Sequence, residues 1–191
     1  MIRRNKIAFV LGVVAGLAFL IFAEDSQAKT VTTKTTSHQA ASAPAKFVDK
    51  LNGFSIELPA GWEQQKDQMG SAIMAISPMD GPKDTFRENI NVVVEVLKEK
   101  LTTKDYFNAS QEVIKKVFTD FKSEKSGQTK IDGHDFMWTI FSHRLGTVRA
   151  RVLQYVVVNK DKAYVITCSS EPDKFNQYMP KFEASIKTFK F

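Results

Sequence analysis

The order of apolar and polar positions divides the chain into an apolar leader, a polar segment and a patterned domain. Ile7–Ala23 is an uninterrupted apolar run of 17 residues. Residues 29–45 are rich in Thr, Ser, Ala and Lys and have no apolar period, which predicts a flexible spacer. Periodic patterns begin near Phe47, so we expect one folded domain over residues 46–191.

Alternating patterns predict short strands in the first half of this domain. Phe47-Val48 and Phe54–Leu58 flank Asn52-Gly53, a dipeptide typical of a two-residue hairpin turn. Ser71–Ser77 predicts a third strand, and Asn89–Leu97 predicts a fourth. One face of the fourth is fully aliphatic and the other is mixed, which is typical of a strand covered on one face and partly covered on the second.

A polar cluster, Arg87–Asn91, stands directly before the aliphatic part of the fourth strand. We interpret Arg87 and Glu88 as a solvated or ion-paired entry to the strand. Asn89 and Asn91 are interpreted as amides that bond to the backbone. No second polar constellation in the sequence complements them, so a catalytic reading is not favoured.

Two amphipathic helices are predicted. Thr102, with Asp105 three residues later, resembles a capping box at the start of the first. Its apolar residues recur at spacings of three to four positions: Tyr106, Phe107, Val113, Ile114, Val117, Phe118 and Phe121. Ser170 and Asp173 predict the start of the second helix, in which Pro180 is expected to cause a kink or a split.

The segment between the helices predicts an antiparallel meander. Strands are expected over His134–Arg144, Thr147–Asn159 and Ala163–Ser170, with a turn at Asp132-Gly133. Strands joined by short turns, together with two amphipathic helices, predict the α+β class.

The leader predicts export. Arg3, Arg4 and Lys6 precede the apolar run, and Ser26 and Ala28 follow it with the small-residue spacing of a cleavage site. Residues 1–28 therefore read as a signal peptide. A run of this length is also close to that of a membrane span, so an uncleaved N-terminal anchor is the alternative. Either way, the domain is expected in the periplasm or at the cell surface.

Composition and charge are typical of a soluble domain and give no sign of nucleic-acid binding. The chain is 43% apolar, and its formal net charge is +6. Because the basic residues alternate with acidic ones along the chain, we interpret the charge as favouring solubility and expect no nucleic-acid partner. The only cysteine, Cys168, excludes an internal disulfide and is expected to be a buried, unreactive thiol.

Ligand-type residues gather at one turn: Asp132, His134 and Asp135 are the candidate metal ligands, for Ca²⁺, Mn²⁺ or Zn²⁺. A plain β-turn is the favoured reading of this segment, and no cofactor is expected. His134 and His143 lie nine positions apart on one predicted strand, so they point to opposite faces and cannot share a metal. Both are interpreted as surface histidines.

Partner binding has one weak candidate surface. Arg149, Arg151 and Tyr155 project from one face of a predicted strand. A solvated strand end is the alternative reading. Motifs for nucleophilic catalysis and for phosphate binding do not occur, so the protein is not expected to be an enzyme.

Several segments, taken in order, resemble the PsbP-like family, which includes bacterial PsbP-related exported proteins and DcrB-type envelope proteins. The segments are FSIELPAGW, FRENINVVVEVL, LTTKDYFNAS, DGHDFMWTIFS, VLQYVVVNKDKAYVITCSS and FEASIKTFKF. The resemblance covers Phe47 to Phe191. It implies an α/β/α sandwich around a central antiparallel sheet, shared by non-enzymatic accessory proteins.

Photosynthetic members of that family help to retain Ca²⁺ and Cl⁻ near the manganese cluster of photosystem II, and other relatives act in the cell envelope. The short leader of this chain differs from a two-part plastid transit peptide. We therefore expect an exported accessory module that binds an envelope or membrane protein. A periplasmic carrier of a metal ion or small ligand is the alternative.

Overall fold

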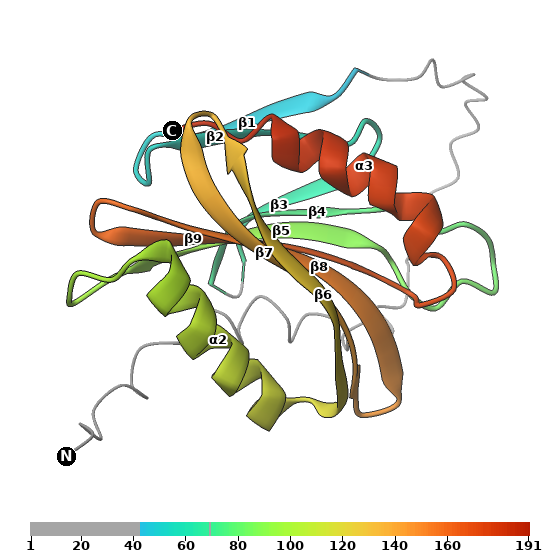
Figure 1. The fold of residues 1–191 in the computed structure, drawn as a ribbon. Coiled ribbons are helices and arrows are strands. Elements are labelled where there is room, and N and C mark those ends of the chain that lie inside the picture. The colour runs from blue at the N-terminus through green and yellow to red at the C-terminus, as the bar shows by residue number, and fades with distance from the viewer. Residues whose placement is uncertain (1–42, 69) are drawn as a thin grey trace.

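The computed structural model describes residues 43–68 and 70–191, which form nine strands and two helices (Figure 1). In chain order the elements are β1 (Ala45–Asp49), β2 (Phe54–Leu58), β3 (Glu63–Gln68), β4 (Ser71–Ile76), β5 (Asn89–Val96), α2 (Thr103–Val117), β6 (Thr119–Ile131), β7 (His134–Leu145), β8 (Val148–Asn159), β9 (Lys162–Ser170) and α3 (Phe175–Lys187). β1 begins one residue before the domain boundary expected from the sequence.

Seven strands form one sheet in the order β3-β4-β5-β9-β8-β7-β6, and β1 and β2 form a separate hairpin. Every strand pairing within the described residues is antiparallel. The edge strands β3 and β6 are mostly exposed and polar. Charged and amide side chains on an edge strand oppose association with further strands.

Alternate residues of the central strands point into two apolar clusters, one on each face of the sheet. On β8, Leu153 and Val157 lie in the cluster that contains α3 and the β1–β2 hairpin. Val152 and Val156, on the other face, lie in the cluster that contains α2. Figure 1 shows the two helices on opposite sides of the sheet. The expected α+β class, with a mostly antiparallel sheet and two helices, is confirmed.

Helix α2 begins where the sequence predicts. The hydroxyl oxygen of Thr102 accepts a hydrogen bond from the N–H of Asp105 at 3.1 Å, which satisfies one free donor of the first turn. The helix ends at Val117, four residues before the end of the apolar stripe. Phe121 instead lies on β6 and packs against the ring of Phe141. The apolar spacing continues past the helix because strand and helix residues contact the same cluster.

Helix α3 begins later than predicted, at Phe175. Ser170 is not its cap, because this residue is still paired with Arg151 in the sheet and its hydroxyl donates to the carbonyl of Glu171. Lys174 occupies the cap position and makes no side-chain cap bond. The helix is not split at Pro180, an exposed residue that α3 accommodates in its second turn.

Two expectations for the first strands are wrong in detail. The β1–β2 turn contains four residues, because Asp49 pairs with Phe54 and residues 50–53 lie between them. Strand β3 was not predicted at all. Its residues are exposed on both faces, so no apolar alternation marks it.

No helix of residues 43–68 and 70–191 is long and apolar enough to cross a membrane. The predicted leader and nearly all of the predicted spacer lie outside the described residues.

Candidate functional site

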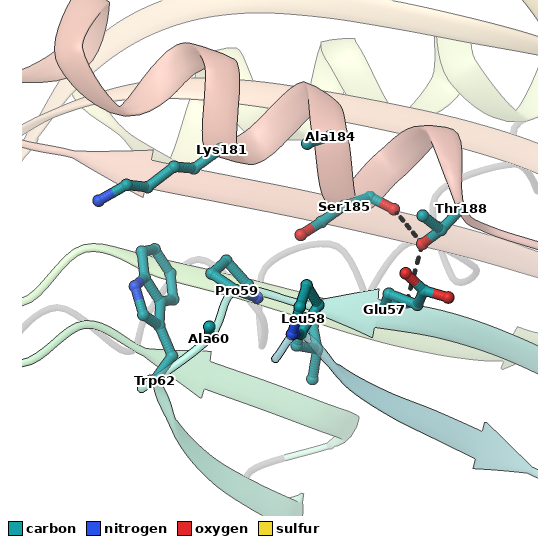
Figure 2. A pocket seen from close by; sticks show the side chains of 10 residues that line it. Glu57, Leu58, Pro59, Ala60, Trp62, Lys181, Ala184, Ser185 and Thr188 are labelled. Carbon is teal, nitrogen blue, oxygen red and sulfur yellow. Dashed lines mark hydrogen bonds between the residues drawn. The ribbon is translucent and has the colours of Figure 1, made fainter. Parts of the chain in front are cut away.

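A groove lies between α3 and the turn that joins β2 to β3 (Figure 2). The turn is the tetrapeptide Pro59–Trp62. The N–H of Trp62 donates to the carbonyl of Pro59 at 3.3 Å, and Gly61 has a φ of 75°, as the third position of a type II turn requires. This local geometry directs the Trp62 ring under α3, where the residue is 8% exposed.

The opposite wall is one face of α3. Lys181, Ala184, Ser185 and Thr188 recur at helical spacing and line the groove. Because Ala184 has only a methyl side chain, it leaves space between the helix and the turn. Figure 2 shows Lys181 beside Trp62 at one end and Thr188 beside Glu57 at the other.

Polar side chains lie at both ends of the groove. Thr188 Oγ1 accepts a hydrogen bond from the N–H of Glu57 at 2.8 Å and donates to the carbonyl of Ser185 at 2.6 Å. At the other end the ammonium of Lys181 lies 5.0 Å from the centre of the Tyr178 ring. The groove has a volume of about 390 Å³, within the range of ligand sites. Its shape and chemistry fit an apolar group with polar ends.

An ionic cluster fixes the start of α3, and with it one wall of the groove. Lys174 Nζ lies 3.0 Å from Asp80 Oδ2, 3.2 Å from Asp84 Oδ1 and 3.2 Å from Glu171 Oε2. Burial alone would lower the pKa of Lys174, but these carboxylates outweigh it and raise the pKa. The loop between β4 and β5 is thereby attached to the helix.

Tyr178 connects this cluster to the groove. Its hydroxyl donates to both carboxylate oxygens of Asp80, at 3.1 and 3.2 Å. Its ring lies 6.1 Å from that of Trp62, measured between ring centres. Burial raises the pKa of Tyr178, so the hydroxyl keeps its proton. The positions of Trp62 and α3 therefore depend on the same residue.

Glu88 corrects one interpretation made from the sequence. It is fully buried, whereas its neighbour Arg87 is ion-paired with Glu63 as expected, at 3.0 Å. The Ser77 hydroxyl donates to Glu88 Oε2 at 3.0 Å. Burial raises the pKa of Glu88, and the hydrogen-bond donors around it only partly oppose this effect. The polar segment before β5 thus contains one residue, Glu88, that lies in the core.

The candidate metal ligands lie at the β6–β7 turn. Asp132 and Gly133 form the turn, as predicted, with φ angles of 48° and 78°. Asp135 is ion-paired with Lys130 at 3.2 Å, and the His134 ring contacts that of Phe191. Within the part of the chain that the structure describes, no three His, Cys, Asp or Glu residues are placed to hold a metal ion. A metal site here stays a prediction.

The candidate partner surface contains one exposed arginine and one arginine that is ion-paired within the domain. Arg149 is exposed. Arg151 is ion-paired with Glu124 at 2.6 Å, and its guanidinium lies 4.4 Å from the centre of the Phe175 ring. Tyr155 packs beside Trp138 at the edge of the core. A partner contact at these residues stays a prediction.

His143 is not a surface residue. It is 3% exposed and its ring stacks on that of Phe118, with 4.0 Å between centres. Burial lowers its pKa from 6.5 to about 4, so the imidazole is neutral at physiological pH. Cys168 is fully buried as expected, and burial raises the pKa of its thiol.

Sequence reasoning did not single out the groove. In the sequence, the turn corresponds to the pattern Pro-Ala-Gly-Trp. The helical wall corresponds to small and polar residues at positions 181, 184, 185 and 188. Neither signal specifies a site until the turn and helix, which are far apart in the chain, are brought together.

The fold is that of a small α+β domain with a groove beside its C-terminal helix. A sequence profile of the PsbP family matches residues 43–191, so the chain belongs to this family. Among curated protein sequences, none matches the chain significantly.

Solved structures with low identity share the fold. Cyanobacterial PsbP (CyanoP) from Synechocystis sp. PCC 6803 has a TM-score of 0.59 and 14% identity, over 82% of this chain and 97% of its own. LpqN of Mycobacterium tuberculosis, described as involved in cell envelope biogenesis, has a TM-score of 0.61 and 11% identity, over 80% and 86%. A Pseudomonas aeruginosa protein of unknown function, PA94, has a TM-score of 0.55 and 16% identity, over 70% and 88%.

Proposed function

We propose that this protein is a non-catalytic binding module of the cell envelope, exported by its leader, which holds an apolar segment of a partner protein in the groove between α3 and the β2–β3 turn. The observation that carries the proposal is the groove itself. Its lining is largely apolar and contains a tryptophan, and Lys181 and Thr188 lie towards its two ends. Tryptophan is enriched among the residues that dominate binding energy in protein interfaces.

Membership of the PsbP family supports a binding role, and the likeness to LpqN supports an envelope location. In this proposal the arrangement expected from the resemblance, an α/β/α sandwich, serves as a rigid scaffold. The Tyr178–Trp62 contact joins the two walls of the groove, and the ionic cluster at Lys174 fixes the start of the helix that forms one of them. A preformed groove loses less conformational entropy on binding than a mobile one does.

A site-specific cross-link tests the proposal. A photoreactive phenylalanine analogue is introduced at Ala184 in the full-length chain, and the cells are irradiated. We expect one dominant envelope protein to be captured. The same analogue at Val117, which is exposed on α2 on the other face of the sheet, is the matched control.

A variant with a filled groove provides a second test of the proposal. Ala60→Trp places a large ring at the turn, and it should abolish the cross-link from position 184 while the circular dichroism spectrum stays unchanged. Capture that is equal from positions 184 and 117, or that survives the filled groove, would overturn the proposal.

A carrier of a small apolar ligand is a second candidate, favoured by the groove volume of about 390 Å³. Native mass spectrometry of the protein isolated from its own cells distinguishes the two. A bound small molecule that Ala60→Trp displaces would favour the carrier, and a protein cross-link without such a molecule would favour the accessory role.

A further inference from the structure

Three turns lie at one end of the molecule, at the opposite end of β2 from the β2–β3 turn that lines the groove (Figure 1). They are the β1–β2 turn at residues 50–53, the loop from β5 to α2 at residues 97–102, and the β8–β9 turn at residues 160–161. Leu51, at the first of these turns, is 86% exposed. Val96, the last residue of β5, is 61% exposed. Large apolar side chains exposed to this extent at one end of a molecule favour contact with another surface.

The β1–β2 turn is not a loose loop. Asp49 Oδ1 accepts from the N–H of Asn52 at 2.8 Å, and Asp49 Oδ2 accepts from the Asn52 side-chain amide at 2.7 Å. The N–H of Gly53 donates to the carbonyl of Asp49 at 2.8 Å, with the positive φ that glycine tolerates. The hairpin thus orders its own turn.

Strand β9 holds the same turn from outside the hairpin. The Tyr164 hydroxyl donates to the carbonyl of Asn52 at 2.6 Å. Lys162 Nζ donates to the carbonyl of Leu51 at 3.1 Å and to Asn52 Oδ1 at 3.2 Å. Six side-chain and backbone hydrogen bonds therefore fix this turn while the side chain of Leu51 projects into solvent.

Basic residues outnumber acidic ones in and beside these three turns. Val96 is paired with Lys162, whose ammonium donates to the Leu51 carbonyl, so this lysine links the end of β5 to the β1–β2 turn. Residues 49–53, 97–102 and 159–162 contain five lysines and three acids, an excess of two positive charges: Lys50, Lys98, Lys100, Lys160 and Lys162 against Asp49, Glu99 and Asp161. We name this surface the lysine–leucine end.

We propose that the lysine–leucine end docks on an anionic lipid bilayer, with the Leu51 side chain inserted below the headgroups. A single apolar residue held on a rigid turn can enter a bilayer without opening the fold. Exposed lysines of these turns, such as Lys50 and Lys160, can extend their apolar stems along the interface and keep their ammonium groups among lipid phosphates. A protein partner would need a complementary pocket, whereas one exposed apolar tip on turns with an excess of positive charge matches an anionic lipid surface more closely.

An environment-sensitive fluorophore tests this inference in the full chain. The probe is NBD attached to cysteine at position 51, since the native Cys168 is buried and does not compete for labelling. The chain is mixed with vesicles of phosphatidylcholine alone or with 30% phosphatidylglycerol. We expect a blue shift and a rise in emission only with the anionic vesicles, and its loss at high salt.

Position 79 is the matched control. Met79 is 53% exposed, and it lies in the loop between β4 and β5, at the opposite end of β5 from Val96. A probe there remains in water if the lysine–leucine end faces the bilayer, even when the N-terminal leader itself enters the vesicle. Equal shifts at positions 51 and 79 would therefore overturn the inference.

A second reporter keeps the test independent of the labelled leucine. With NBD at position 96, Leu51→Asp or the double reversal Lys50→Glu and Lys160→Glu should raise the lipid concentration needed for half-maximal shift by about tenfold. The inference is wrong if neither variant changes this concentration. It is also wrong if position 51 responds to an envelope protein fraction stripped of lipid but not to anionic vesicles, which would indicate a protein partner.

Discussion

Glu88 places a carboxyl group in the core beside the groove-bearing helix. Its pKa is raised by burial from the ordinary value of 4.5, so the folded state binds the proton more tightly than the unfolded state does. The stability associated with the protonated form is complete below about pH 4.5. It decreases as the pH rises through the pKa of the folded state.

Glu88→Gln removes this titration while keeping the shape of the side chain. We expect the melting temperature of the variant to exceed that of the wild type at pH 7 by about 2–4 °C, and the difference to disappear near pH 4. Thermal unfolding followed by circular dichroism from pH 4 to 8 measures it. Glu99→Gln, at an exposed carboxylate, should reproduce the wild-type profile; a difference for Glu88→Gln that is constant with pH would contradict the assignment.

The effect of His143 on the pH dependence of stability has the opposite sign to that of Glu88. Its pKa is lowered from 6.5 to about 4 by burial, so the unfolded state binds the extra proton more tightly. Stability should therefore fall as the pH decreases from 6.5 towards 4, by about 3 kcal/mol if the whole shift is expressed. Above pH 6.5 the residue is neutral in both states and the effect vanishes.

His143→Phe should remove this acid sensitivity, because phenylalanine can also stack on Phe118. Urea denaturation at pH 7 and at pH 4.5 gives the two free energies of unfolding. We expect the loss between these pH values to be smaller in the variant than in the wild type. His134→Phe at the half-exposed turn is the control, and an unchanged loss in His143→Phe would refute the prediction.

Among the strands, β6 shows how an edge is fixed without an apolar face. Gly127 lies opposite Trp138 in β7, and a Cβ atom at this position would lie 2.9 Å from the indole ring. The ring occupies the space that any other residue would need. The close packing of Trp138 on β6 therefore requires glycine at position 127.

Gly127→Ala should lower the free energy of unfolding by about 1–3 kcal/mol, since the indole must move away from its neighbours. Ser126→Ala, at the adjacent exposed position, should change it by less than about 0.5 kcal/mol. Denaturant titrations followed by Trp fluorescence compare the two. If the two variants are equally stable, the ring has moved without cost and the argument fails.

Elements differ in how well the sequence predicted them. The central strands and the start of α2 were predicted because they bury an alternating face or carry a capping residue. β3 was not predicted, because a polar strand exposed on both faces has no periodic pattern of apolar residues. The four-residue β1–β2 turn was not predicted either, because contacts with Asp49 and with β9 order it. Long-range contacts decide such segments.

On the scale of the whole molecule, the two apolar clusters share one sheet. Phe182 of α3 and Ile114 of α2 are both fully buried, on opposite faces. Because β5, β7, β8 and β9 each contribute to both clusters, loss of packing on either face should weaken the same cooperative unit.

Phe182→Ala and Ile114→Ala should each lower the free energy of unfolding, by about 3–5 and 2–5 kcal/mol. Both variants are expected to retain a single unfolding transition, seen at the same denaturant concentration by circular dichroism and by Trp fluorescence. Separate transitions for the two probes would mean that the two faces unfold independently.

The sequence by itself determined the α+β class, the strands of the central sheet, the cap of α2 and the family, because periodicity and turn chemistry are local properties. Only the tertiary structure decided that Glu88 and His143 are buried, that Pro59–Trp62 faces α3 across a groove, and that Leu51 is held out by β9. Residues become buried, grooves form and side chains are held in solvent when segments about a hundred residues apart pack together. No local sequence pattern specifies which segments will pack against each other.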